Sequence, residues 1–211
     1  MDAPPDVTEY LDRLVGRLGE MLGERLVAAY ALGSLALGGY RPGRSDVDVL
    51  AVVDGTLPVE DLRLLAQRCV HASLPCPARK LELVVIGAAE AREPGPRPRW
   101  QLNLNSGADM NDHVGLDPAA EPSHWFVLDL AIAPRHAVVL TGPPASEVVG
   151  EPDPEHVREA QADAVAWYAH HEPGSGAVAA ACRAWHWNET GRFAGKTEAL
   201  RWALGRLGSP A

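Results

Sequence analysis

The feature that most constrains this chain is a pair of aspartates at the start of an apolar, β-branched run. Asp46 and Asp48 are separated by one residue, and the rest of 47–53 is valine, leucine and alanine. This composition predicts a strand buried on both faces. Because side chains two apart on a strand share a face, both carboxylates point toward one spot. Two like charges this close raise each other's pKa, and a hard divalent cation such as Mg²⁺ relieves the repulsion.

A second motif lies upstream of the aspartates. Gly33 and Ser34 follow the apolar run 26–32, which we predict to be a strand, and precede a short predicted helix from Leu35. Such a turn presents backbone N–H groups and a hydroxyl that can hold a phosphate. An Asp-x-Asp pair by itself is more often a solvated strand end. Together with a phosphate-binding turn it indicates Mg-nucleotide chemistry.

A third carboxylate interrupts another apolar strand. Residues 81–86 predict a strand, and Glu82 lies inside it. A buried Glu needs a cation or a hydrogen-bond donor, because an unpaired buried charge is costly. Two interpretations remain open. In the first, Glu82 forms a salt bridge to Arg79 or Lys80 or lies at an edge that faces water. In the second, it is a third active-site carboxylate beside Asp46 and Asp48.

The order of elements predicts an α+β fold with two domains. The N-terminal domain, 1–149, holds a mixed β-sheet with helices against it. A Pro-rich stretch at 150–154 marks the boundary, and 150–211 forms an α-helical bundle. Residues 100–105 form either a strand or a short helix, and Pro134 kinks or ends the helix that starts at 123. The other expected helices cover 7–22, 58–73, 155–170, 176–190 and 197–207.

Composition excludes several classes of protein. The net charge of −9 argues against broad nucleic-acid binding, so we expect no nucleic-acid partner. The acidic N-terminus does not resemble a signal peptide, and no apolar run reaches membrane-spanning length. The 3 cysteines have no metal-site spacing and are expected to be reduced thiols. We therefore expect a cytoplasmic protein with no membrane partner; the sequence leaves the oligomeric state open.

Residues 33–48 resemble the signature of the nucleotidyltransferase superfamily that includes DNA polymerase β: Gly-Ser, a spacer, then Asp-x-Asp. The spacer 38–45 contains a Gly-Gly, a Pro and a Ser before the first Asp. In this it is similar to the aminoglycoside 3″/9-adenylyltransferases, the streptomycin and spectinomycin resistance enzymes. The resemblance implies ATP as co-substrate and transfer of AMP to a hydroxyl of a small molecule.

The resemblance also implies roles for individual residues. Asp46 and Asp48 would hold two Mg²⁺ ions, and Glu82 would act as general base on the acceptor hydroxyl. Asp129 lies in an Asp-Leu-Ala-Ile stretch that matches the family, and Arg183 and Lys196 lie in stretches that resemble Ser-Arg-x-Trp and Thr-Gly-x-x-x-x-Lys. Arg183 and Lys196 have a second interpretation, as capping or solvated residues. The implied nucleotide-binding set is Gly33, Ser34, Ser45, Asp129, Arg183 and Lys196.

The acceptor is the least determined part of this prediction. In the family a Trp near position 100 walls the acceptor pocket, but Trp100 can equally be a packing residue. Family members that take streptomycin or spectinomycin carry an acidic loop, and here the matching stretch 170–176 has Glu172 as its only acid. Two other hypotheses stay open: an antitoxin-like nucleotidyltransferase module that binds or adenylylates a protein partner, and a relic that binds nucleotide without turnover.

Overall fold

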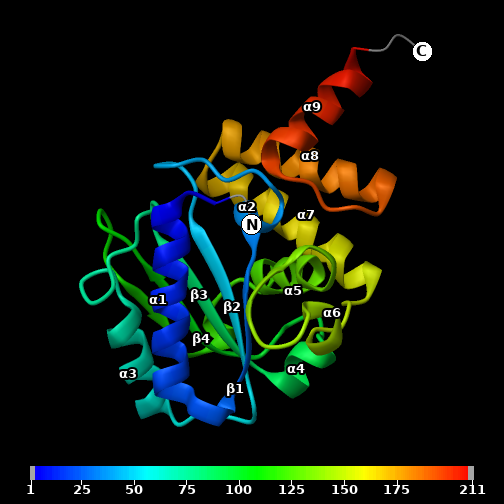
Figure 1. Cartoon of the computed structure of the whole chain (residues 1–211). Coiled ribbons are helices and arrows are strands. Elements are labelled where there is room, and N and C mark those ends of the chain that lie inside the picture. Colours follow the sequence, from blue (N-terminus) through cyan, green and yellow to red (C-terminus); the bar gives the residue numbers. More distant parts are fainter. Residues whose placement is uncertain (1–2, 209–211) are drawn as a thin grey trace.

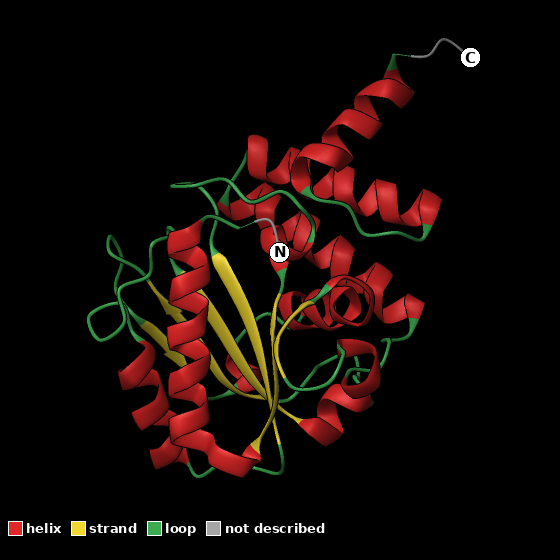
Figure 2. Cartoon of the chain, viewed as in Figure 1, coloured by secondary structure: helices red, strands yellow, loops and turns green. Residues whose placement is uncertain are grey.

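The computed structural model describes residues 3–208, and a mixed sheet organises them (Figure 2). Within this range the sheet has 6 strands in the order β5-β4-β3-β2-β1-β6. β2 and β3 are parallel, and every other neighbouring pair is antiparallel. The predicted α+β fold with a mixed sheet is therefore confirmed. The strands are β1 (Leu26–Ala31), β2 (Val47–Val53), β3 (Leu81–Gly87), β4 (Trp100–Ser106), β5 (His113–Gly115) and β6 (Val138–Thr141).

Helices cover both faces of the sheet (Figure 1). α1 and α3 lie on one face, and α4, α5 and α6 lie on the other. α7 packs along α5, and α8 and α9 continue away from the sheet toward the C-terminus. The helices are α1 (Pro5–Leu22), α2 (Gly33–Ala36), α3 (Val59–Cys69), α4 (Ala88–Arg92), α5 (His124–His136), α6 (Ala145–Val148), α7 (Pro154–His171), α8 (Ser175–Thr190) and α9 (Lys196–Leu207), with short 3₁₀ turns at Gly23–Arg25 and Pro118–Ala120.

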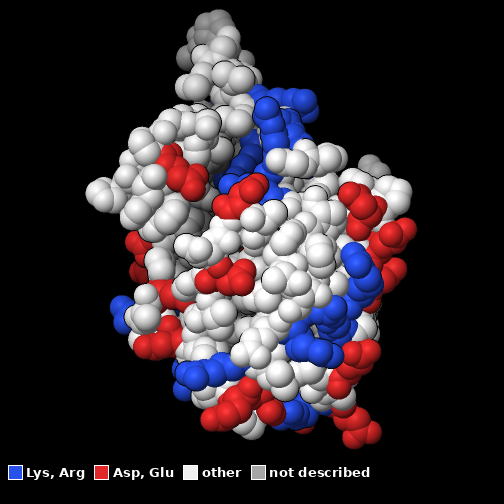
Figure 3. All heavy atoms as spheres, turned by 90° about the vertical axis from the view of Figure 1, so that its left-hand side faces the viewer, with Lys and Arg blue, Asp and Glu red and all other residues white. Residues whose placement is uncertain are grey.

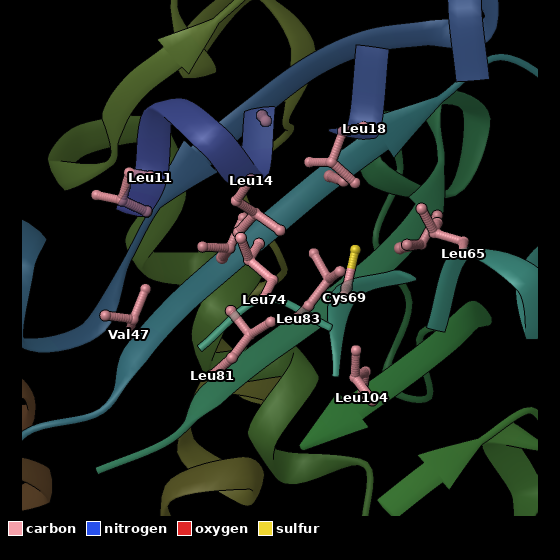
Figure 4. Close-up of a cluster of buried hydrophobic side chains, with 14 of the residues drawn as sticks. Leu11, Leu14, Leu18, Val47, Leu65, Cys69, Leu74, Leu81, Leu83 and Leu104 are labelled. Carbon is pink, nitrogen blue, oxygen red and sulfur yellow. The ribbon is translucent and has the colours of Figure 1, made fainter. Parts of the chain in front are cut away.

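The larger part of the core lies between α1, α3 and the sheet (Figure 4). Leu11, Leu14 and Leu18 recur at helical spacing along α1, so they form one apolar stripe. The stripe packs against side chains such as Val47 and Leu83, which β2 and β3 send to this face. Burial of these residues removes apolar surface from water and fixes which face each strand presents.

The opposite face of β2 and β3 is apolar except at one end. Leu50 and Ile86 pack there against Leu130 of α5. Because side chains alternate along a strand, Asp48 shares this face with Leu50, and Glu82 shares it with Ile86. Strand parity therefore places two carboxylates at the end of an apolar layer, under the helix that carries Asp129.

One of the two sequence alternatives, that Pro134 ends α5, is wrong. The helix continues to His136, and the amide of Ala137 still bonds to the carbonyl of Ala133. Pro134 has no N–H to give to the carbonyl one turn earlier. In the last turn this removes only one intrahelical bond, so the apolar packing of α5 outweighs the loss.

One helix boundary differs from the sequence prediction, and one segment that the sequence left ambiguous is now assigned. The helix expected at 58–73 ends at Cys69, because Val70 adopts extended backbone with φ −60° and ψ 155°. Residues 100–106 form a strand, not a short helix; they pair with β3 on one side and β5 on the other. The division at 149/150 stays a prediction.

The described residues contain no helix long and apolar enough to cross a lipid bilayer. Cys69, Cys76 and Cys182 are free thiols, and the first two are buried.

Truncating the stripe of α1 should destabilise the protein. Leu14 is 0% exposed, so Leu14→Ala removes buried methyl groups and leaves a cavity, which should lower the free energy of unfolding by about 2–5 kcal/mol. Leu204, on α9, is 67% exposed, so Leu204→Ala should change it by less than about 0.5 kcal/mol. Urea denaturation of both variants measures the difference. Equal losses would contradict this description of the core.

Candidate active site

The centre of the site is a pair of carboxyl groups on neighbouring parallel strands. Asp48 of β2 lies directly opposite Glu82 of β3 in the strand register. Burial raises the pKa of Asp48 well above its usual range, and the charges of Glu82, Asp129 and Asp46 raise it further. The site therefore holds more negative charge than its own residues neutralise.

A third acid and a cation approach this pair from the helices. Burial and the charge of Glu82 raise the pKa of Asp129 on α5 to about 7, while the charge of Arg183 works in the opposite direction. Burial lowers the pKa of Arg183 on α8, and Tyr168, Asp129 and Asp48 act to raise it. α8 thus carries a largely desolvated guanidinium to the acids of the sheet.

Asp46 has a partner of its own. It lies one residue before β2, and Arg79 donates to it through Nε at 2.7 Å and through Nη2 at 2.6 Å. This bidentate bond is the main cause that raises the pKa of Arg79. Sequence reasoning considered Arg79 only as a partner of Glu82 and missed this pair. Arg79 therefore occupies the carboxylate predicted to bind metal.

Gly33, the first residue of α2, lies against Asp48. A Cβ atom on Gly33 would lie 1.8 Å from Oδ2 of Asp48, and the φ of Gly33 is +53°. Only glycine satisfies both conditions without strain. Among the described residues, the Ser34 hydroxyl oxygen is buried without a hydrogen-bond partner. A buried hydroxyl in that state is costly, and a bound ligand oxygen or a water would satisfy it.

The loop after α2 connects the site to α9. Ser45 Oγ accepts a hydrogen bond from the Arg41 amide at 2.9 Å, and the Arg41 guanidinium donates to Thr197 Oγ1 at 2.9 Å. Lys196, the first residue of α9, is exposed beside this loop. In Figure 3, Lys and Arg side chains gather below the C-terminal helix, with Asp and Glu beside them. The cluster is thus a local basic feature on a chain whose net charge is −9.

The two predicted acceptor residues lie in different places. Trp100 is 2% exposed, packs on Phe126 with ring centroids 5.1 Å apart, and pairs with Ile86, four residues beyond Glu82. At the rise of a strand, the position of Trp100 is therefore about 13 Å along the sheet from that of Glu82. Packing against Phe126 explains why Trp100 is buried. Glu172 is exposed at the end of α7, and its charge raises the pKa of Arg79 and of Tyr168, so it lies near the carboxylates.

Aromatic residues that sequence reasoning did not select surround the same region. Tyr168 of α7 meets Trp125 of α5 edge-on with centroids 5.4 Å apart, and Trp167 lies 5.1 Å from Trp125. Burial and the charge of Glu172 raise the pKa of Tyr168, and Arg183 works against them. Trp125 precedes Asp129 by one helical turn, and that spacing was a signal available in the sequence.

The donor set fits a hard cation that the substrate helps to bind. In the part of the chain that the structure describes, no group of 3 or more His, Cys, Asp or Glu side chains is preformed as a metal site. Asp48 and Glu82 supply negative charge for a cation, and Arg79 holds Asp46. Mg²⁺ is usually bound by one or two carboxylates together with substrate phosphates. Such a site would be completed only by a ligand that brings phosphate oxygens of its own.

Comparison with known proteins agrees with this geometry. Residues 11–91 match the nucleotidyltransferase domain family. The predicted resemblance is confirmed. This segment contains Gly33, Asp46, Asp48 and Glu82, so the domain match includes the carboxylate pair and the glycine turn.

Longer similarities extend past this domain. Spectinomycin 9-adenylyltransferases from Staphylococcus aureus, among them those of strains Mu50 and N315, are 27% identical over 194 residues, which is 88% of this chain and 73% of theirs. A crystal structure of spectinomycin adenyltransferase from Enterococcus faecialis with ATP and spectinomycin superposes with a TM-score of 0.72 at 18% identity. That match covers 96% of this chain and 83% of the other, so the two share their fold, C-terminal helices included.

Replacing Gly33 should damage the site more than replacing another glycine with positive φ. Gly33→Ala adds backbone strain and a clash with Asp48. Gly38 has a φ of +64° but open space around its Cβ position, so Gly38→Ala should cost only the strain, about 1–2 kcal/mol of unfolding free energy. We expect Gly33→Ala to abolish ATP binding by calorimetry and Gly38→Ala to retain it. Equal binding by the two variants would contradict the close approach of Gly33 to Asp48.

Asp129 should make stability fall as pH rises in metal-free protein. Its pKa is about 7 in the folded state against 3.8 for an ordinary Asp, so between these values the folded chain binds more protons than the unfolded chain. Stability must then decrease with pH over this interval. The Asp129→Asn variant lacks this titration. We therefore expect its free energy of unfolding, relative to that of the original protein, to rise by about 1–4 kcal/mol between pH 4.5 and pH 8. Urea denaturation in EDTA measures this, and a constant difference across that range would contradict it.

Proposed function

We propose that this chain is a Mg²⁺-dependent adenylyltransferase that transfers AMP from ATP to a hydroxyl group of a small antibiotic of the spectinomycin class. The observation that carries the proposal is the register of β2 and β3, which brings Asp48 and Glu82 together in a domain of nucleotidyltransferase type. The similar enzymes named for spectinomycin, one of them crystallised with ATP and spectinomycin, support the choice of substrates.

ATP would bind between the sheet and the C-terminal helices. The buried hydroxyl of Ser34 lacks a partner among the described residues, and Gly33 leaves room for close approach, so this turn is suited to phosphate oxygens. Arg183 faces the acids from α8, and its fork of donors matches a phosphate. Ser45 and Lys196 would contact the triphosphate from the loop after α2 and from the start of α9. Asp129 would contact the nucleoside from α5.

Glu82 would act as the general base. Its carboxylate would accept the proton of the acceptor hydroxyl, whose oxygen then forms a bond to the α-phosphorus as the bond to pyrophosphate breaks. Two Mg²⁺ ions held by Asp46 and Asp48 would supply neutralisation of the charge on the phosphate oxygens. Arg79 would have to release Asp46 for this purpose. Arg183 would hold the phosphates in place, so that positioning and electrostatics supply most of the acceleration.

The acceptor would lie between Glu82 and the aromatic residues of α5 and α7. Glu172 is near enough to act on Arg79 and Tyr168, so it could pair with a cationic amino group of the acceptor. Trp125 and Tyr168 are partly exposed and offer flat apolar walls for a ring. Trp100 would support the pocket from within the core, because its ring is buried.

The test is a transfer reaction with defined acceptors. Purified protein is incubated with ATP, Mg²⁺ and, separately, spectinomycin, streptomycin and other aminoglycosides, and products are identified by mass spectrometry. Adenylylated spectinomycin with stoichiometric pyrophosphate supports the proposal. ATP binding without transfer to any acceptor would overturn the choice of acceptor, whereas a tight protein complex without ATP binding would favour the antitoxin-like module.

Neutralising either central carboxylate should stop transfer and keep the fold. Asp48→Asn and Glu82→Gln each remove a charge without changing shape, and we expect kcat to fall about 1,000-fold or more, equivalent to about 4 kcal/mol of activation free energy. Glu20→Gln, at an exposed position on α1, is the matched control and should retain full activity. Pyrophosphate release reports the rate, and circular dichroism reports the fold. An Asp48→Asn variant that releases pyrophosphate at the original rate would refute the assignment.

A further inference from the structure

We propose that Lys80 is a positioning residue that holds the carboxylate of Glu82 against Asp48, and that a chain of hydrogen bonds across β4 and β5 holds Lys80 in turn. The inference deepens the proposed function, since it rests on Glu82 being the general base. It gives a role to Lys80, which the sequence offered only as a salt-bridge partner of Glu82, and to residues of β4 and β5 that were not among the predicted site residues.

Lys80 joins Glu82 to the next strand. Its ammonium group forms an ion pair with Oε1 of Glu82 and donates to Oδ1 of Asn105 at 3.0 Å. Lys80 precedes Glu82 by two residues, so the two side chains lie on the same side of the chain. Asn105 of β4 is the register partner of Glu82. The Lys80 side chain is 20% exposed, so solvent screens this ion pair only in part.

The chain of hydrogen bonds continues away from Glu82. Asn105 Nδ2 donates to Asn103 Oδ1 at 3.1 Å, and Asn103 Nδ2 donates to Glu121 Oε2 at 2.5 Å. The other oxygen of Glu121 lies 3.0 Å from Nε2 of His113 on β5. In both Asn105 and Asn103, the carbonyl oxygen and the amide nitrogen are therefore each hydrogen-bonded to a neighbour. Polar networks whose members are paired in this way are rigid.

Local structure is adapted to this chain of bonds. A Cβ atom on Gly115 would lie 1.9 Å from Oε1 of Glu121, so only glycine at this position of β5 lets the Glu121 carboxylate reach His113 and Asn103. Asn103 is 9% exposed, and a buried amide in that position needs the partners that Asn105 and Glu121 supply. The hydrogen-bond chain across β4 and β5 thus depends on the small size of Gly115 and on the paired amide of Asn103.

Repulsion is the reason why Glu82 needs such support. Glu82 lies beside Asp48, and its charge also raises the pKa of Asp129. The Glu82 side chain is 36% exposed and could rotate toward water to escape the other acids. The ammonium of Lys80 opposes that rotation, and Asn105 keeps the ammonium in place. Each of two neighbouring cations neutralises a different acid, since Arg79 pairs with Asp46 and Lys80 pairs with Glu82.

Kinetics of Lys80 variants test the proposal with ATP and spectinomycin as substrates. Lys80→Met keeps the length of the side chain without the charge. We expect kcat to fall about 10- to 100-fold while the KM for ATP stays within about twofold, because a displaced base slows chemistry without weakening the triphosphate site. Lys80→Arg should restore at least part of kcat, and Asn105→Leu should lower it less than Lys80→Met does.

The matched control removes an ion pair elsewhere. Arg25 pairs with Asp61 at 3.0 Å near the opposite end of β2, so Arg25→Met should leave both kinetic constants unchanged. A Lys80→Met variant whose kcat is within twofold of the original, or whose loss of kcat Lys80→Arg does not reduce, would overturn the positioning role. Urea denaturation of each variant shows whether a loss reflects unfolding.

A readout without turnover separates this inference from the proposed function. In a crystal structure of Lys80→Met we expect the Glu82 carboxylate to have turned away from Asp48, and in Lys80→Arg to have stayed. Glu82 unmoved in Lys80→Met would overturn the inference. If the unaltered protein binds ATP but transfers nothing to spectinomycin, the proposed acceptor fails, and the crystal structures still decide the role of Lys80.

Discussion

The site depends on the parallel pairing of β2 with β3. This pairing sets Asp48 opposite Glu82, while every other neighbouring strand pair in the described sheet is antiparallel. Sliding one strand by a single residue would send its carboxylate to the opposite face, among the leucines under α1. The apolar side chains that alternate with the acids therefore do more than form the core. They fix the register, and the register brings the two carboxyl groups together.

Bringing acids together has an electrostatic cost that the structure distributes over three cations. Arg79 binds Asp46, Lys80 binds Glu82, and Arg183 approaches Asp129 and Asp48 from α8. Burial raises the pKa of Asp48, and the charges of Glu82, Asp129 and Asp46 raise it further, so some negative charge stays uncompensated. A site of this kind favours cationic ligands, and it gains most from a ligand that brings metal and phosphate together.

Much of this arrangement could be predicted from the sequence, because strand parity is a local property. The runs around Asp48 and Glu82 indicated two buried strands, and alternation predicted that Asp46 and Asp48 share a face. For Glu82 the sequence left two interpretations open, and the pairing of β2 with β3 places it opposite Asp48. Their approach to each other in the structure follows from that pairing, while their catalytic roles remain proposals. The helical C-terminal region was also predictable, and the match to a solved fold along 96% of the chain confirms it.

The contacts that could not be predicted depend on distant parts of the chain. Arg79 had two acids within reach, and only the course of the loop before β3 decides that it binds Asp46. The pairing of Lys80 with Asn105 requires the register of β4, and a register irregularity next to Ile86 sets the place of Trp100. β5 and β6 are short strands at the two edges of the sheet, too short to give a clear periodic signal.

The central claim is that Asp46, Asp48 and Glu82 form one cation-dependent site for a nucleotide. A crystal structure with Mg²⁺ and a non-hydrolysable ATP analogue tests it most directly. The account predicts metal density between carboxylate oxygens of Asp46 and Asp48 and the phosphates, with Arg79 no longer bound to Asp46. Nucleotide bound elsewhere, or bound here with the Arg79–Asp46 pair intact and no metal on Asp48, would contradict it.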